Sequence, residues 1–444
     1  MSDDRSPPVE RGPLEKFLAL FADVRRGEAG TALLLAFNVF LLLTCYYIIK
    51  PVREALILGT PGGAEIKSYS SAGQVVLLLF LIPAYSAFAN RVNRVQLITW
   101  VTAFFIACLV AFFALAQAKV PLGIVFFLWI GIFNLMIVAQ FWSFANDLYT
   151  EEQGKRLFAI IAFGSTLGAI LGAVIAKLLI APLGVNQLML VAAVVLGACV
   201  VITRLVDARV RRAGAHLARA AEAPLDKSGG FQLVLGNRYL LLIGLLLLAI
   251  NLVNSNGEYI LGKTLSLLAD RNIAAGVNGA MAAGDYKKEF IGGFYAGYFT
   301  WVNIATAIIQ LFLVSRILKW FGVRAALFLM PAVALGGYAM LALSPLLALV
   351  RGVKIAENSL DYSLQNTARQ ALFLPTSRDA KYKAKAAIDT FFVRAGDVLS
   401  AVLVFIGAQL ALGPQQFAGV NVVLVVVWLL VLAGVAREHR KLSA

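Results

Sequence analysis

Cysteine and histidine are scarce in this sequence, and their scarcity excludes several classes of functional centre. The three cysteines, Cys45, Cys108 and Cys199, each lie inside an apolar run without Cys-x-x-Cys spacing, and the two histidines lie in polar segments. Isolated cysteines provide neither a disulfide framework nor a zinc site. No Gly-x-x-x-x-Gly-Lys-Ser/Thr phosphate loop occurs either. We therefore expect no metal, no cofactor and no catalytic residues, so the protein is not predicted to be an enzyme.

Charged residues are also few, and apolar residues take their place. Only 14% of the 444 residues are charged, 60% are hydrophobic, and the mean hydropathy is +0.82, whereas soluble domains contain about 25% charged residues. Apolar runs of about 20 residues, long enough to cross the hydrocarbon core of a bilayer, recur along the whole chain. The composition predicts an all-α integral membrane protein with twelve transmembrane helices. These helices are expected at residues 29–58, 67–89, 95–117, 120–147, 156–180, 184–206, 239–268, 290–315, 323–343, 346–375, 386–411 and 417–436.

Acidic residues are outnumbered by basic ones, 24 against 39, which gives a formal net charge of +15. The basic residues gather in alternate connections between the predicted helices, whereas the other connections are short and mostly lack them, apart from the polar outer loop Asp270–Glu289. This is the positive-inside pattern, and it places both termini in the cytoplasm. The excess charge is therefore a topology signal, and we expect membrane lipids rather than nucleic acid as its partner.

The chain divides into two bundles of six helices at a polar connection. We expect a cytoplasmic N-terminal segment, two bundles joined by a basic linker, and a cytoplasmic tail. Their bounds are 1–28, 29–206, 207–238, 239–436 and 437–444. Parallel halves of this kind are typical of the major-facilitator arrangement, with a substrate site near the bilayer midplane. The linker predicts an amphipathic helix that rests on the anionic leaflet, in preference to a regulatory site. We expect a monomer.

One predicted span contains glycines at every fourth position, Gly164, Gly168 and Gly172. Small residues at this spacing allow two helices to approach closely in lipid. The spacing therefore predicts a close helix–helix contact rather than a phosphate site.

The tenth predicted span contains the densest set of polar residues. At 100° per residue, their spacings of three and four confine them to an arc of about 80°. The set is Arg351, Lys354, Asn358, Asp361, Gln365 and Arg369. A charge in hydrocarbon is costly unless it faces water, a partner or a substrate, so the stripe predicts the lining of a central cavity whose positive balance suits an anion. An internal ion-pair ladder, in which Lys354 reaches Asp361 or Glu357, is the alternative, and Arg351 could mark only the outer interface.

The first predicted span ends in YYIIKPVREALIL, which places two basic residues three positions apart. Lys50 and Arg53 share a face, Glu54 follows, and Pro51 interrupts the helical hydrogen bonding. Broken helices with basic groups are common anion sites in transporters. Lys50 is equally compatible with a side chain that extends to the outer headgroups.

The seventh span places Asn251, Asn254 and Glu258 on one face. Glu258 is expected to pair with Lys50 or Arg53 of the first span, or alternatively to accept a coupling proton.

The eleventh span contains three charged residues that are expected to face inward. Asp389, Arg394 and Asp397 are predicted to form neutralising pairs with the tenth span rather than to contact a ligand.

Several stretches of the chain are similar to one transporter family. DYSLQNTARQALFLP and KYKAKAAIDTFFVRAGD, which cover 361–397, are the most specific, and YYIIKPVREAL, FWSFANDLYTEEQGKRLF and NLVN add to them. They resemble the bacterial and plastid nucleotide transporters, the non-mitochondrial ATP:ADP antiporters of the major-facilitator fold. The resemblance implies that Lys50 and Arg53 contact nucleotide phosphates. Arg369 stands where the family has lysine, Gln370 where it has glutamate, Asn366 where it has aspartate and Thr367 where it has proline, which indicates a divergent bacterial member.

The leading hypothesis is a transporter in the bacterial inner membrane that exchanges phosphorylated anions, with nucleotides favoured, by alternating access. The residues expected to bind phosphate are Lys50, Arg53, Arg351, Lys354 and Arg369, and those expected to orient the substrate are Asn254, Asn358, Asp361 and Gln365. The residues expected to act in coupling or gating are Glu54, Glu258, Asp389, Arg394 and Asp397. The alternatives are a proton-coupled transporter of another anionic solute or lipid, and a membrane sensor or scaffold that transports nothing.

Overall fold

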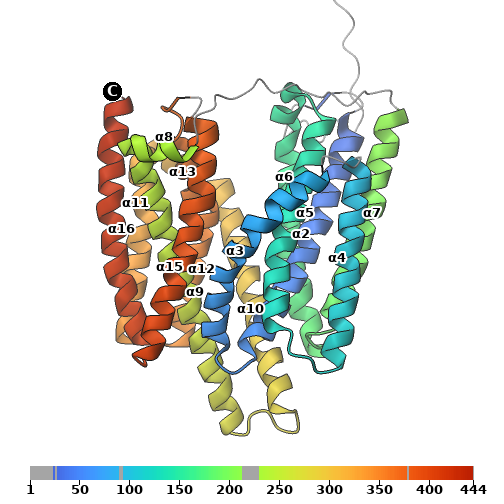
Figure 1. Ribbon diagram of the computed structural model, residues 1–444, viewed down its shortest axis with the longest axis vertical. Helices are drawn as coiled ribbons and strands as arrows, with labels where there is room; N and C mark the ends of the chain where they lie inside the picture. The colour runs from blue at the N-terminus through green and yellow to red at the C-terminus, as the bar shows by residue number, and fades with distance from the viewer. Residues whose placement is uncertain (1–23, 26–27, 90–93, 213–229, 378–379, 444) are drawn as a thin grey trace, which may run out of the picture.

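The chain folds into long helices that lie roughly side by side (Figure 1). The computed structural model describes residues 24–25, 28–89, 94–212, 230–377 and 380–443. Within these residues, nine helical segments are long and apolar enough to cross a membrane. Large apolar side chains such as Phe80, Trp100 and Leu178 are more than half exposed on the outside of the bundle, as expected of surfaces that face lipid. The protein is a multi-pass membrane protein.

The helices fall into two groups in Figure 1, here called the N-terminal and C-terminal groups. The N-terminal group consists of α2 (Glu28–Leu58), α3 (Gly63–Ala89), α4 (Arg94–Gln117), α5 (Gly123–Leu148), α6 (Glu151–Leu183) and α7 (Leu188–Arg212). The C-terminal group consists of α8 (Gly230–Gly236), α9 (Arg238–Ala274), α10 (Ala283–Ile308), α11 (Val314–Leu343), α12 (Leu347–Leu360), α13 (Asn366–Ala371), α14 (Lys385–Ala387), α15 (Val393–Gln409) and α16 (Pro414–Ser443). The groups meet where α3 packs on α9 and α15, and where α10 packs on α2 and α6.

Several helices of the C-terminal group are interrupted by π-helical turns, in which hydrogen bonds join residues five apart. These turns are η1 (Ile309–Leu313), η2 (Asp361–Gln365), η3 (Ala380–Ala384) and η4 (Ile388–Phe392). At η2 the N–H of Asn366 donates to the carbonyl oxygen of Asp361. Such a turn rotates all following side chains relative to a regular α-helix, so faces predicted from an even repeat do not continue through it.

The predicted contact at the glycine ladder is confirmed. A Cβ atom added to Gly164, Gly168 or Gly172 of α6 would lie 2.2–2.4 Å from backbone carbonyl oxygens of α2. The hydroxyl of Thr44 in α2 also donates to the carbonyl oxygen of Gly168 at 3.3 Å. Backbone therefore lies directly against backbone along this pair of helices.

The outer loop predicted at Asp270–Glu289 is largely helical instead. Helix α9 continues to Ala274, α10 begins at Ala283, and their turn projects beyond the other helices at one end (Figure 1). The Lys287 ammonium pairs with the Asp270 carboxylate at 2.6 Å across the two helices. Polar residues can continue a helix beyond the bilayer because their side chains remain hydrated. A prediction from apolar residues alone therefore underestimates the length of such a helix.

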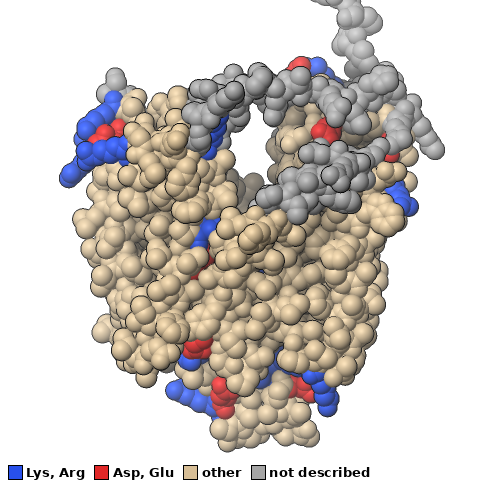
Figure 2. Space-filling view, viewed as in Figure 1, with Lys and Arg blue, Asp and Glu red and all other residues tan. Residues whose placement is uncertain are grey.

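The charged side chains on the face shown in Figure 2 gather mainly toward its two ends, apart from a few along the groove between the groups. The C-terminal end of α16 and the C-terminal end of α7 lie at the same end of the molecule, opposite the turn between α9 and α10 (Figure 1). Most of the predicted N-terminal segment 1–28, and residues 213–229 of the predicted linker 207–238, lie outside the described residues.

Candidate functional site

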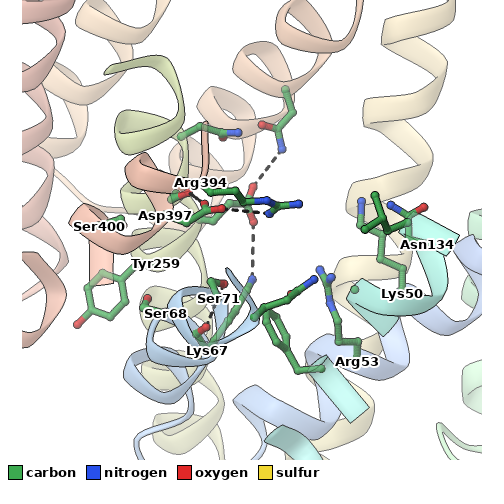
Figure 3. Close-up of a pocket in the computed structure, with 18 of the residues that line it drawn as sticks. Lys50, Arg53, Lys67, Ser68, Ser71, Asn134, Tyr259, Arg394, Asp397 and Ser400 are labelled. Carbon is green, nitrogen blue, oxygen red and sulfur yellow. Dashed lines mark hydrogen bonds and ion pairs between the residues drawn. The ribbon is translucent and has the colours of Figure 1, made fainter. Parts of the chain in front are cut away.

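A polar cavity of about 310 Å³ lies between the two groups. Helices α2, α3 and α5 line it from the N-terminal group, and α9, α10, α12, η2 and α15 line it from the C-terminal group. Figure 3 shows basic side chains entering this space from opposite sides. The charged residues that line it are Lys50, Arg53, Lys67, Glu258, Arg394 and Asp397. A cavity between two helical groups is a usual place for a small-molecule site.

Lys50 is a buried basic residue without an acidic partner in the part of the chain that the structure describes. Its side chain is 8% exposed, and its ammonium lies 4.1 Å from the ring centre of Phe299 and 5.0 Å from that of Tyr47. None of the described residues forms an ion pair with it. Aromatic faces attract a cation, yet they compensate only part of its lost hydration. The lysine therefore lies at the cavity with its charge largely unbalanced.

The next basic groups share one carboxylate. Arg53 donates from Nε to Glu54 Oε1 at 2.9 Å, and its guanidinium also stacks on Phe127. Lys67 of α3 pairs with Glu54 Oε2 at 2.7 Å. Glu54 is completely buried. Because it pairs with both Arg53 and Lys67, it holds the two cations at the cavity wall.

Lys67 also connects the two groups of helices. Its Nζ lies 3.8 Å from Glu258 Oε2 of α9. Glu258 Oε1 lies 3.6 Å from Nζ of Lys354, and Lys354 pairs with Glu357 at 2.8 Å. Cations and anions thus alternate from Arg53 to Glu357. Glu258 pairs across the groups as expected, but among the described residues its partner is Lys67 rather than Lys50 or Arg53.

The opposite wall presents one basic residue, Arg394 of α15. Its Nη1 donates to Asp397 Oδ2 at 3.2 Å. Asp397 Oδ1 accepts hydrogen bonds from Asn251 at 2.9 Å and Ser255 at 2.8 Å, both on α9. These partners differ from the predicted ones: Arg394 and Asp397 pair with each other and with α9, not with the tenth span.

A second cavity of about 300 Å³ lies nearer the end of the molecule that contains α13 (Figure 1). Arg369 lies 4.0 Å from Asp361, and Lys385 pairs with Asp389 at 2.6 Å. Asp389 therefore also pairs within its own helical segment instead of with the tenth span. Two cations and two acids line this cavity, so its charge is balanced.

The predicted stripe of the tenth span does not face one cavity, and that expectation is wrong. Asn358 lines the first cavity, whereas Asp361 and Arg369 line the second. Lys354 is completely buried; besides Glu357, it donates to Asn254 Oδ1 at 2.6 Å, as the ion-pair alternative expects. Asp361 is the first residue of the turn η2, and Arg369 lies beyond that turn in α13.

Two further residues of the stripe also lie apart from the first cavity. Arg351 is only partly buried, and its guanidinium lies 5.4 Å from the ring centre of Phe294. Gln365, within η2, is 1% exposed. Neither is among the residues that line the two cavities in the described part of the chain.

Sequence reasoning missed Lys67, which lines the cavity and contacts both groups. Its position at the start of the second predicted span suggested an outer interface. The spacing Glu65-x-Lys67 was the available signal, because two charges at a membrane helix start have to be satisfied by neighbours. Glu65 pairs with Lys263 of α9 at 2.6 Å and accepts a hydrogen bond from Tyr259 at 2.9 Å. These contacts join the groups at the end of the cavity away from α13.

The described residues contain no cluster of three or more His, Cys, Asp or Glu side chains suited to a metal ion. What the site offers is positive charge, hydrogen-bond donors and aromatic rings between two groups of membrane helices.

A sequence model of the Major Facilitator Superfamily matches residues 32–356. The chain belongs to the Major Facilitator Superfamily. This superfamily member is also 23% identical to ADP,ATP carrier protein 1 of Chlamydia pneumoniae, over 95% of this chain and 93% of that one. ADP,ATP carrier protein 1 of Chlamydia trachomatis is 23% identical over 81% of this chain and 79% of its own. The resemblance to nucleotide transporters predicted from the motifs is confirmed.

Solved structures show the same fold. A crystal structure of the nucleoside transporter NupG matches with a TM-score of 0.63 at 14% identity, over 90% of this chain and 98% of the other. A transporter of the POT family in complex with 5-aminolevulinic acid matches with a TM-score of 0.63 at 14% identity, over 96% of this chain and 98% of the other. These relatives and neighbours are transporters rather than enzymes, and this chain is a membrane transporter of the major-facilitator type.

Proposed function

We propose that twelve transmembrane helices form two bundles, 29–206 and 239–436, with both termini in the cytoplasm of a bacterium and the protein in its inner membrane. Among the nine candidate spans, Ala283–Leu343 has 61 residues, about three times the length that one crossing needs. Gly322, with φ 75°, breaks it into two. Helix α3 and the series α12, η2, α13 supply the remaining two spans. The basic connections predicted from the sequence support this orientation.

We propose further that the transporter exchanges phosphorylated anions, with nucleotides favoured, through the cavity between the bundles. The observation that supports this most is the buried ammonium of Lys50, which forms no ion pair with any described residue. A lone charge in a membrane protein is costly and marks a functional site by default. Four cations and two acids line the cavity, and the buried Glu54 pairs with two of the cations, so a positive excess of +1 remains for an anion to neutralise.

The contact between Lys67 and Glu258 offers a reason for exchange. Lys67 is shared between Glu54 and Glu258 at 2.7 and 3.8 Å. A phosphate at Lys50 and Arg53 would compete with Glu258 for Lys67 and weaken this link between the bundles. Reorientation would then be favourable when the site is occupied and unfavourable when it is empty, which is the behaviour of an exchanger.

The aromatic residues that line the cavity suit the base of a nucleotide. The rings of Phe127, Tyr259, Phe299 and Tyr362 line the cavity beside the cations, and aromatic rings stack on bases without sequence preference. The curated relatives are ADP,ATP carriers, which supports the same class of substrate.

Counterflow in proteoliposomes tests the proposal. Vesicles loaded with ADP are expected to take up external labelled ATP with the purified protein and not without it. Lys50→Gln should abolish this uptake, whereas Lys319→Gln, which removes a charge from an exposed position, should preserve it. Absence of ATP uptake by the wild-type protein would refute nucleotide exchange.

Proton-coupled transport of another anion is the second candidate, because Glu258 lies at the junction of the bundles between Lys67 and Lys354. A carboxylate in this place can link protonation to the contact between bundles. Uptake driven by a pH gradient and lost in Glu258→Gln would favour this mechanism. If Glu258→Gln still performs ATP/ADP counterflow and wild-type uptake ignores the pH gradient, exchange is favoured.

A further inference from the structure

Arg394 differs from the other basic residues of the cavity in the number of donors that it leaves free. A guanidinium has five N–H donors, and among the described residues Arg394 uses one of them, toward Asp397. Its side chain is 38% exposed. It therefore offers several hydrogen-bond donors to the cavity in a planar arrangement that suits phosphate oxygens.

The arginine is also held in place. Asp397 is fixed to α9 by the amide of Asn251 and the hydroxyl of Ser255, both through its Oδ1. Its other oxygen faces Arg394 at 3.2 Å. Because Asp397 divides its charge among three donors, it orients the guanidinium without occupying it fully.

Figure 3 shows Arg394 on the opposite side of the cavity from Lys50 and Arg53. Lys50 and Arg53 belong to α2 in the N-terminal bundle, and Arg394 belongs to α15 in the C-terminal bundle. A single compact phosphate can satisfy one wall, whereas a chain of phosphates presents negative oxygens to both. Contact with both walls would draw the bundles together around the substrate.

We infer that Arg394 binds the far end of a polyphosphate chain whose near end lies at Lys50 and Arg53, with Asp397 as its positioning residue. The inference rests on the proposed function and narrows its substrate class to phosphate esters with two or more linked phosphates, as in nucleoside di- and triphosphates. Arg394 thereby becomes a specificity-determining residue rather than the gating residue that the sequence suggested.

Binding of AMP and ATP to the purified full-length protein, measured by isothermal titration calorimetry, tests this assignment. The two ligands share adenosine and differ in the length of the phosphate chain. Arg394→Gln is expected to weaken ATP binding by about 10- to 100-fold, in line with the loss of charge-assisted hydrogen bonds, and AMP binding by less than about threefold. Arg440→Gln, at an exposed position in α16, is the matched control and should change neither affinity.

Asp397→Asn tests whether Asp397 positions Arg394 or only stabilises the fold. It should weaken ATP binding by less than Arg394→Gln does, and should cause no further loss in the Arg394→Gln background, because both changes act through one guanidinium. Arg394→Lys should restore part of the ATP affinity.

The possible outcomes are distinct. Equal losses for AMP and ATP in Arg394→Gln, or additive losses in the double variant, would overturn the assignment and leave nucleotide exchange intact. Wild-type protein that binds AMP as tightly as ATP would overturn it as well. Wild-type protein that binds neither ligand would overturn both this inference and the proposed function.

Discussion

Two buried lysines, one in each group of helices, have different surroundings. Lys354 is completely buried, pairs with Glu357 at 2.8 Å and donates to Asn254 at 2.6 Å. Lys50 is almost as buried, yet its ammonium lies over the rings of Phe299 and Tyr47. A lysine with a carboxylate and an amide around it is compensated by the fold. Lys50 has no such partner among the described residues, and this difference, rather than burial alone, supports the proposal that a ligand binds beside it.

Replacing Lys354, the lysine that has an ion-pair partner, is expected to have the largest effect on stability. Lys354→Met leaves Glu357 as an unpaired buried charge and should lower the free energy of unfolding by about 3–5 kcal/mol. Thermal unfolding in detergent measures the loss. The double variant Lys354→Met with Glu357→Leu should recover most of it. An undiminished stability of Lys354→Met would show that the pair is not what balances this region.

Lys50, by contrast, is expected to contribute to the stabilisation that a bound ligand provides. Saturating ATP is expected to stabilise the wild-type protein by about 2.7 kcal/mol at a hundredfold excess over the dissociation constant. In Lys50→Met this stabilisation should vanish while Lys354-dependent stability stays unchanged. Thermal shifts with and without ATP provide the comparison, and equal shifts in both proteins would contradict the role of Lys50.

Without ligand, the same substitution should have a small effect of opposite sign to that of Lys354→Met. Replacing Lys50 by methionine removes a buried charge that lacks an ion-pair partner among the described residues, so the free energy of unfolding should rise by up to about 1 kcal/mol. Denaturation of the two proteins in the same detergent measures it. A marked loss of stability would mean that Lys50 has a structural partner.

The smallest effect is expected at the partly exposed ion pair between the groups. Glu65→Gln weakens the contact with Lys263 and should cost about 1 kcal/mol or less, because solvent screens such pairs. Its larger consequence should be functional, since Glu65 joins α3 to α9 and also accepts a hydrogen bond from Tyr259, which lines the cavity. A cysteine at Ser68, introduced into a variant without native cysteines, should react faster with a membrane-impermeant thiol reagent in the Glu65→Gln background.

The sequence predicted a helical membrane protein because each apolar run is a local signal, and nine candidate spans occur among the described residues. Lys50 and Arg53 could also be singled out locally, since two basic residues beside Pro51 are unusual within an apolar run. The pairing of Glu258 could not be predicted in detail, because it depends on which helix of the other bundle comes within 4 Å. The stripe of the tenth span failed for a different reason: a shared helix face does not fix position along the axis. Arg369 lies about 16 Å beyond Asn358, past the turn η2, and the two residues line different cavities.

The glycine ladder between α2 and α6 has a consequence for how the carrier moves. The two backbones are in contact along three successive turns. Neither helix can slide or rotate past the other without a steric clash, so the two helices are expected to move as one rigid unit. Lys50 and Arg53 lie on α2 and are part of that unit. In the proposed alternating access, these two cations would therefore change the side of the membrane that they face without any rearrangement of their own side chains.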